Sequence, residues 1–253
     1  MRADAVLYLG DTALDNAAAY LAGLMHHWGW PFDHVPSDNP AGPELFASKR
    51  SLYVVSDYPS QQLAGNLLKR LLDDVDSGAG LLMIGGWESY NGLGGDWDAT
   101  ALASALPVEI AGDDDRVNCD RPLLIRKVRN HESVDGLPWD ERPPLIGGFN
   151  RVVPKADGNV ILESEQIQVR RDGDRFEFAP GPREPLLVTG TFGSGRTAAL
   201  TTDVAPHWVG PLVDWGGGRV TAKADGANQV EVGDLYAQFL FQLLNWTRGG
   251  RLH

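Results

Sequence analysis

The amino-acid sequence predicts an α/β protein built on a doubly wound, mostly parallel sheet, with an antiparallel β extension in the C-terminal half. Over the first 85 residues, short apolar runs alternate with stretches of helical periodicity, which is the pattern of βαβ units. The run at 81–84 is apolar throughout, as expected of a strand buried on both faces of a parallel sheet. From residue 160 onward, alternating strands and hairpin turns replace this pattern.

The N-terminal elements follow from periodicity and from residues that start or stop them. Apolar runs predict strands at 5–9, 30–35, 51–55 and 81–84, and Asp11 or Thr12 is expected to cap the first helix. Helices are expected at about 14–28 and 63–75, because each has apolar residues at helical spacing. These residues are Leu14, Ala18, Leu21, Ala22 and Met25 in the first helix, and Leu67, Leu68, Leu71 and Leu72 in the second.

The C-terminal half is expected to be richer in strands. A short helix at 100–106 leads into residues 107–110, and short strands are expected at 123–128 and 145–153. Asp172-Gly173 and Gly193-Ser194-Gly195 predict hairpin turns, followed by a buried strand at 196–202 and a closing helix at 235–246. The hairpin strands are expected at 160–163, 166–170, 176–178 and 186–189. We expect one domain over 1–253, with 111–190 as an irregular, β-rich insertion.

Composition narrows the class of protein. The chain has 253 residues, of which 43% are hydrophobic and 22% charged, as is usual for a soluble globular protein. Its net charge of −12 disfavours binding to nucleic acid or to anionic lipid. No run reaches the roughly 20 apolar residues of a membrane span, and the N-terminus lacks the features of a signal peptide. We therefore expect a cytoplasmic protein without nucleic-acid or membrane partners.

The single cysteine, Cys119, excludes an intrachain disulfide and fits a reducing compartment. Its acidic neighbours should raise the pKa of the thiol, which argues against a reactive thiolate. The acidic run at 113–115 is expected to be a solvated loop. Because no His-x-x-x-His or Cys-x-x-Cys spacing exists, we expect no metal site, and no motif indicates a cofactor.

Four loops carry polar or aromatic residues directly after a predicted parallel strand. The carboxyl ends of such strands share one edge of the sheet, where ligands bind, so we expect these loops to form one cleft. His207 is the only histidine expected at a strand end, and it would lie there with carboxylates and a hydroxyl. The candidate catalytic residues are Glu88, Ser89, Asp203 and His207, and the candidate ligand-binding residues are Gly10, Asp11, Asp57, Tyr58, Gly86, Trp87 and Trp208.

Plainer roles remain open for some of these residues. Asp11, Asp57 and Ser89 are of the types that cap helix N-termini. A relay from Ser89 to His207 is conceivable, but Trp87 occupies the place of the glycine that lets a nucleophile elbow turn tightly.

The chain resembles an uncharacterised bacterial family described as glutamine amidotransferase-like, and more distantly the trehalose-utilisation-type proteins. The resemblance rests on Gly85-Gly86-Trp87-Glu88-Ser89-Tyr90-Asn91-Gly92, Pro107-Val108-Glu109-Ile110, Asp114-Asp115-Arg116-Val117, Gly148-Phe149-Asn150, Gly193-Ser194-Gly195-Arg196 and Asp203-Val204-Ala205-Pro206-His207-Trp208. It implies a class I glutamine amidotransferase-like, or flavodoxin-like, fold.

The resemblance also implies a mechanism that this sequence does not match. An active class I amidotransferase uses an elbow cysteine with a histidine and a glutamate. Here the elbow falls at 87–89 without a thiol, and His207 takes the place of the relay histidine. We expect a small polar metabolite to bind in the strand-end cleft, without thiol-dependent glutamine hydrolysis. Two alternatives stay open: a hydrolase that uses Ser89 or a water activated by His207, and a non-catalytic, homo-oligomeric structural or partner-binding protein.

Overall fold

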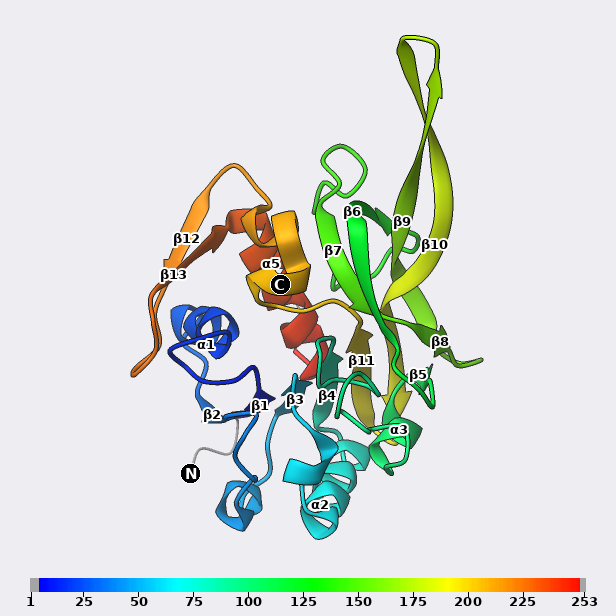
Figure 1. Cartoon of the computed structure of the whole chain (residues 1–253). Coiled ribbons are helices and arrows are strands. Elements are labelled where there is room, and N and C mark those ends of the chain that lie inside the picture. Colours follow the sequence, from blue (N-terminus) through cyan, green and yellow to red (C-terminus); the bar gives the residue numbers. More distant parts are fainter. Residues whose placement is uncertain (1–4, 251–253) are drawn as a thin grey trace.

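The computed structural model describes residues 5–250 (Figure 1). Within them, a nine-stranded sheet runs in the order β2-β1-β3-β4-β11-β10-β9-β6-β7. Its first five strands pair in parallel: β2 (Phe32–Val35), β1 (Val6–Gly10), β3 (Leu52–Ser56), β4 (Gly80–Ile84) and β11 (Gly195–Leu200). The other four continue the sheet in antiparallel fashion: β10 (Arg175–Phe192), β9 (Asn159–Asp172), β6 (Arg116–Lys127) and β7 (Leu145–Asn150). The predicted α/β fold with an antiparallel extension is confirmed.

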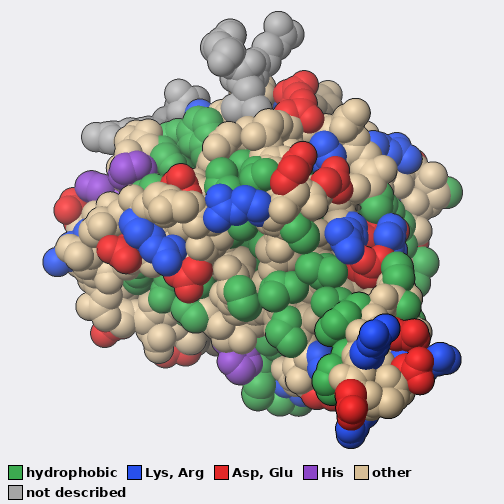
Figure 2. Space-filling model, turned by 90° about the horizontal axis from the view of Figure 1, so that it is seen from above, with side chains coloured by type: hydrophobic (Ala, Val, Ile, Leu, Met, Phe, Trp, Pro, Cys, Tyr) green, Lys and Arg blue, Asp and Glu red, His purple; other side chains and the backbone are tan. Residues whose placement is uncertain are grey.

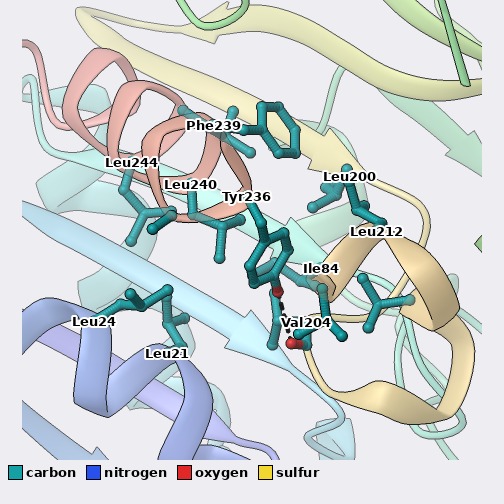
Figure 3. Packing of buried hydrophobic residues seen from close by; sticks show 14 of the residues in the cluster. Leu21, Leu24, Ile84, Leu200, Val204, Leu212, Tyr236, Phe239, Leu240 and Leu244 are labelled. Carbon is teal, nitrogen blue, oxygen red and sulfur yellow. Dashed lines mark hydrogen bonds between the residues drawn. The ribbon is translucent and has the colours of Figure 1, made fainter. Parts of the chain in front are cut away.

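Helices cover both faces of the parallel strands. α1 (Ala18–His27) and α5 (Asp234–Thr247) lie on one face, and α2 (Gly65–Asp76) and α3 (Leu102–Ala105) lie on the other (Figure 1). Successive residues of a strand point to opposite faces of the sheet. The residues of each buried strand therefore contribute alternately to two hydrophobic cores, the first beneath α1 and α5 and the second beneath α2 and α3. Figure 3 shows the first core, where Tyr236 of α5 packs among leucines and donates a hydrogen bond of 2.7 Å to the carbonyl of Val204.

Both N-terminal helices begin later than the sequence predicts. α1 starts at Ala18 and α2 at Gly65, and neither has a side-chain cap. The prediction that Asp11 or Thr12 caps α1 is therefore wrong. The residues before α1 form turns instead, because Asp11 and Thr12 both take positive φ values of 55°.

The extension is more regular than the sequence predicts. Two long strands, β9 and β10, replace the four short hairpin strands, and their pairing continues through polar residues with register shifts near Pro180 and Pro185. Residues 116–122, expected to be irregular, belong to β6. These strands are exposed on at least one side over much of their length, so they lack the apolar runs on which the sequence prediction depended.

Smaller elements complete the chain. β5 (Val108–Ile110) pairs with β8 (Val152–Pro154), and β12 (Arg219–Ala222) pairs with β13 (Val230–Gly233). The second hairpin was not predicted, although Asp225-Gly226 is a turn signal, because each of its strands has only four residues. The remaining elements are α4 (Pro206–Val209) and the 3-10 helices η1 (Pro43–Phe46), η2 (Ser60–Gln62) and η3 (Gly210–Asp214). Among residues 5–250, none of the helices has the length and apolar character needed to span a membrane.

Candidate functional site

Three carboxylates, which we call the acid cluster, meet beyond the carboxyl ends of the parallel strands. Asp11 follows β1, Asp57 follows β3 and Asp203 follows β11. Asp11 is 1% exposed and Asp203 is 5% exposed, while Asp57 is partly buried. The parallel strands place the three carboxylates together because their C-terminal ends lie side by side at one edge of the sheet.

Each acid of the cluster has hydrogen-bond donors of its own. Asp11 accepts from the hydroxyl of Tyr8 and, at 2.9 Å, from the hydroxyl of Ser56. Oδ1 of Asp203 accepts from the first two N–H groups that follow it, at 2.5 and 3.0 Å. Oδ1 of Asp57 accepts the N–H of Glu88 at 2.8 Å. These bonds fix the carboxylates in place and compensate in part for their burial.

Burial and mutual repulsion keep protons on the acid cluster. Burial, followed by the charges of Asp203 and Asp57, raises the pKa of Asp11 well above its usual value. Burial and then the charge of Asp203 raise the pKa of Asp57 to about 7. Burial raises the pKa of Asp203 to about 6, against the effect of its two N–H donors and of His207. Near neutral pH the cluster therefore holds both protonated and ionised carboxyl groups, which donate and accept hydrogen bonds, respectively.

The turn after β4 is clamped between the acid cluster and the antiparallel extension. A Cβ atom at Gly86 would lie 2.1 Å from Oδ1 of Asp57, so only glycine fits there. Asn150, at the end of β7, accepts the N–H of Gly86 at 2.9 Å and donates to its carbonyl at 3.1 Å. Asn150 also donates to Oδ1 of Asp115 at 2.7 Å, and Asp115 accepts the N–H groups of Asn91 and Gly92.

Neither Asn150 nor Asp115 was predicted from the sequence to be a site residue. Asp115 was expected in a solvated loop, but its side chain is only 3% exposed and its burial raises its pKa. Its neighbour Asp114 is exposed, as expected, and pairs with Arg116 at 2.8 Å. The available signal was the presence of both Asp115 and Asn150 in the motifs shared with the resembling family. Composition alone cannot distinguish the one buried aspartate of an acidic run.

Trp87 and His207 form the accessible part of the site. The Trp87 side chain is 42% exposed, and its indole N–H donates to Nε2 of His207 at 2.9 Å. The guanidinium of Arg116 lies 4.7 Å from the Trp87 ring, a cation–π contact. His207 is itself exposed, on α4. An aromatic ring and an imidazole are thus open to solvent beside the acid cluster, whereas the Arg116 side chain against the ring is only 13% exposed.

Three of the predicted site residues are engaged in packing. Ser89 is fully buried, and its Oγ accepts the N–H of Asp57 at 2.8 Å. Tyr58 is buried and donates from its hydroxyl to the carbonyl of Asn39 at 2.8 Å. Trp208 is buried and donates to Asn118 at 2.7 Å.

Helix capping does not explain Asp11 or Asp57. Neither α1 nor α2 has a side-chain cap, so this plainer role is excluded for both aspartates.

Two cavities adjoin these loops. One has a volume of about 430 Å³ and is lined by Thr12, Ser37 and Glu88 among others. The other, of about 460 Å³, is lined by His207 together with residues 15–17 and 228–230. A cavity of about 810 Å³ lies elsewhere, beside the edge strand β2, and none of the predicted site residues lines it. Over residues 5–250, no group of three or more His, Cys, Asp or Glu side chains is arranged to hold a metal ion.

No helix follows β4 directly. Residues 85–101 form turns and loops, and the next helix of the described chain, α3, begins at Leu102. A nucleophile elbow needs a sharp turn from strand to helix, which exposes the nucleophile at the turn. The segment at 87–89 therefore differs from an elbow in shape as well as in sequence.

Comparisons with known proteins agree on the family and the fold. The family described as "Putative glutamine amidotransferase" matches residues 47–221 of this chain. Two cytoplasmic proteins from Salmonella typhimurium share the fold. One is 23% identical with a TM-score of 0.70 over 96% of this chain and 98% of the other, and the second is 22% identical with a TM-score of 0.72 over 96% and 99%.

A ThuA-like protein from Parabacteroides merdae is 13% identical, with a TM-score of 0.60 over 100% of this chain and 92% of the other. No curated protein matches. At these identities the solved structures show the fold alone. The family match covers more than half of the chain and confirms the resemblance found in the sequence. The chain therefore belongs to the glutamine amidotransferase-like family.

Proposed function

We propose that this protein binds a small polar ligand, neutral or cationic, in the strand-end cleft. The observation that carries the proposal is the acid cluster, whose raised pKa values keep it partly protonated near neutral pH, next to the exposed Trp87–His207 pair. A hydroxyl group both donates and accepts hydrogen bonds, and a protonated amino group only donates them. A cluster with protonated and ionised carboxyl groups can therefore bind either kind of group. The negative charge of the cluster disfavours an anion, and the indole face suits the apolar face of a sugar-like ring.

The proposal excludes glutamine hydrolysis through a thioester. Cys119 is a residue of β6 and not of the turn after β4, and burial followed by the charge of Asp120 raises the pKa of its thiol. A thioester mechanism needs a thiolate at a strand-to-helix turn with backbone donors for the oxyanion. The loop that follows β4 has neither the thiol nor the helix.

A hydrolase that activates water is the second candidate. The favouring observation is that the pKa values of Asp57 and Asp203 are raised close to neutrality, where a general acid or base is most effective. The serine arm of this alternative has less support. The Oγ of Ser89 is buried and already accepts a backbone N–H.

A thermal-shift screen tests the binding proposal. The probes are neutral sugars, polyols and small amino compounds, each with a matched anionic analogue such as a sugar acid. A ligand that binds only the native state raises Tm by mass action. We expect a neutral or cationic probe to raise Tm, its anionic analogue to do so less, and Trp87→Ala to abolish the shift.

The matched control is His26→Ala, which alters the cavity beside β2 and leaves the strand-end site untouched. A shift that survives Trp87→Ala but disappears in His26→Ala would assign the ligand to that other cavity and refute the proposal. If a bound probe is also converted, the pH dependence of turnover should inflect between about 6 and 7 and be lost in Asp203→Asn. That result would establish the second candidate.

We also propose that the protein acts in the cytoplasm. The two Salmonella typhimurium neighbours are described as cytoplasmic, and the single, unpaired cysteine of this chain fits a reducing compartment. Fractionation of cells that express the chain, followed by immunoblotting, checks this assignment.

A further inference from the structure

The hairpin of β9 and β10 extends beyond the body of the protein. Residues 166–182, which we call the arm, project away from the other elements (Figure 1). The arm starts after Glu165, which is buried and accepts from Arg126 at 2.7 Å and from Arg183 at 2.8 Å. Asp172 pairs with Arg175 across a tight turn at the tip. Every residue from 168 to 180 is exposed.

One face of the arm is apolar. Phe178 pairs across the strands with Val169, and Pro180 pairs with Ile167, so their side chains share one face. Phe176 lies on the same face, two residues before Phe178, and its cross-strand partner Arg171 donates to the carbonyl of Gly173 at the tip at 2.8 Å. Phe176 is 62% exposed, Phe178 is 71% exposed and Val169 is 42% exposed. Hydrophobic side chains lie open to solvent beside charged ones at one corner of the molecule (Figure 2).

The opposite face of the arm is polar. Arg170 and Glu177 pair across the strands, with 3.5 Å between Nε and Oε2, and Gln168 pairs with Ala179. An antiparallel ribbon with one apolar and one polar face normally buries the apolar one. A two-stranded ribbon alone in water is marginally stable, and exposed aromatic residues side by side mark a binding surface. The apolar face of the arm therefore needs a cover that the body of the same chain does not supply.

A groove at the base of the apolar face can receive an aromatic ring. It has a volume of about 300 Å³ and is lined by Leu124 of β6 together with Ile167, Phe178 and Pro180 of the arm. A dry, apolar cavity of about 150 Å³ suffices to bind benzene, so this groove is large enough for a phenyl ring. Phe176, near the tip of the arm, is not among its lining residues.

The charges of the arm favour a second copy of this chain as the occupant. The arm contains three arginines and three acidic residues and is therefore neutral, whereas the whole chain carries −12. A basic partner would bind the acidic body rather than the arm. An anionic surface would not be attracted to the arm, because the arm has no net positive charge. The apolar face is also self-complementary, because a twofold axis brings the ring at the tip of each arm to the groove at the base of the other.

We propose that the chain forms a homodimer through the arm. The apolar faces of two arms pack together in antiparallel, twofold fashion, and Phe176 of each copy enters the groove beside Leu124 of the other. The twofold relation forms each contact twice and buries Phe176 and Phe178 from both chains. The neutral arms bring the copies together while the two acidic bodies stay apart.

Sedimentation velocity over a range of micromolar concentrations tests the proposal, with Phe176→Ser/Phe178→Ser as the disrupting variant. We expect dimers for the wild-type chain and a dimer Kd raised by roughly 100-fold or more in the variant, since each buried aromatic contributes a factor of about ten or more. The matched control is Glu177→Ser, which lies between the two phenylalanines on the polar face and should shift Kd by less than about threefold. A monomeric wild-type chain, or a dimer that persists in the double variant, would overturn the proposal.

Disulfide trapping tests the geometry independently. In a Cys119→Ser background, Phe176→Cys together with Leu124→Cys should give covalent dimers on mild oxidation, because each tip meets the groove of the other copy. Phe176→Cys with Val153→Cys serves as the control, since Val153 is 63% exposed on β8, outside the arm and its groove. Equal cross-linking by both pairs would contradict the proposed arrangement, as would binding of the arm to neutral lipid vesicles without self-association.

Discussion

The indole N–H of Trp87 donates a 2.9 Å hydrogen bond to Nε2 of His207, across 120 positions of the sequence. Indole is only a donor, so Nε2 of His207 accepts and the ring proton of the neutral imidazole resides on Nδ1. The bond joins the loop after β4 to the loop after β11. Nδ1 already carries that proton, so His207 can act as a base only through Nε2, after a ligand has displaced Trp87.

The first prediction concerns stability and pH. The folded protein raises the pKa of Asp57 from about 3.9 in the unfolded chain to about 7, so between these values the native state holds a proton that the unfolded state has lost. This contribution to the free energy of unfolding is complete below about pH 4 and is lost as the pH rises through 7. Its slope is about 1.4 kcal/mol per pH unit for one full proton.

Asp57→Asn removes that dependence. An asparagine keeps an acceptor for the N–H of Glu88 and stays neutral at every pH. Urea unfolding between pH 4 and 8 should show the variant gaining stability relative to wild type as the pH rises. A constant difference between the two proteins across this range would show that the proton at Asp57 is not linked to folding.

The second prediction compares two adjacent aspartates. Asp115→Ala leaves the N–H groups of Asn91 and Gly92 and one N–H of the Asn150 amide without an acceptor, and should lower the free energy of unfolding by roughly 3 kcal/mol. Asp114→Ala removes an exposed ion pair with Arg116 and should cost less than about 1 kcal/mol. Denaturant titration measures both values. Equal losses would mean that burial of Asp115 does not determine the stability of the turn.

The third prediction concerns the glycine of the turn. In Gly86→Ala the new Cβ atom would lie 2.1 Å from Oδ1 of Asp57, which forces the turn or the acid cluster to shift. We expect a loss of roughly 2 kcal/mol, or roughly 4–8 °C in Tm. Gly112→Ala, where nothing lies within 4 Å of the added atom, is the control and should leave Tm unchanged or slightly raised. A stable Gly86→Ala variant would contradict this packing.

The fourth prediction is that Cys119 is a slow nucleophile. Burial and the charge of Asp120 raise the pKa of its thiol, so little thiolate exists near neutral pH. An aromatic disulfide reagent at pH 7.5 should label Cys119 more slowly than it labels free cysteine, and Cys119→Ser should melt within a few degrees of wild type. Rapid, stoichiometric labelling would show a lowered pKa instead.

The fifth prediction is that the purified protein releases no ammonia from glutamine. The physical reason is the absence of a thiol and of a following helix at the turn after β4. An ammonia assay over hours, with Cys119→Ser and Ser89→Ala in parallel, is the measurement. Activity lost in Cys119→Ser would refute the prediction, whereas activity that survives there and is lost in Ser89→Ala would support the serine mechanism.

The sequence by itself determined the parallel half of the sheet. Strands buried on both faces must be apolar throughout, so residues 52–56 and 80–84 are visible as runs without any structure. The proximity of Asp57 and Asp203 also follows from the sequence. Each comes directly after a predicted parallel strand, and the carboxyl ends of parallel strands share one edge of the sheet. The outer parts of β9 and β10 that form the arm were harder to predict, because a two-stranded ribbon exposed to solvent needs no apolar run.

The tertiary structure alone decided which side chains hold the site together. Asn150 reaches Gly86 across 64 positions, and this contact exists only because the end of β7 returns to the ends of β4 and β11. Asp115 is buried for the same reason, although its two aspartate neighbours are exposed. Periodicity reports which face of one element is apolar, but burial of a single polar residue depends on elements distant in sequence that complete its hydrogen bonds.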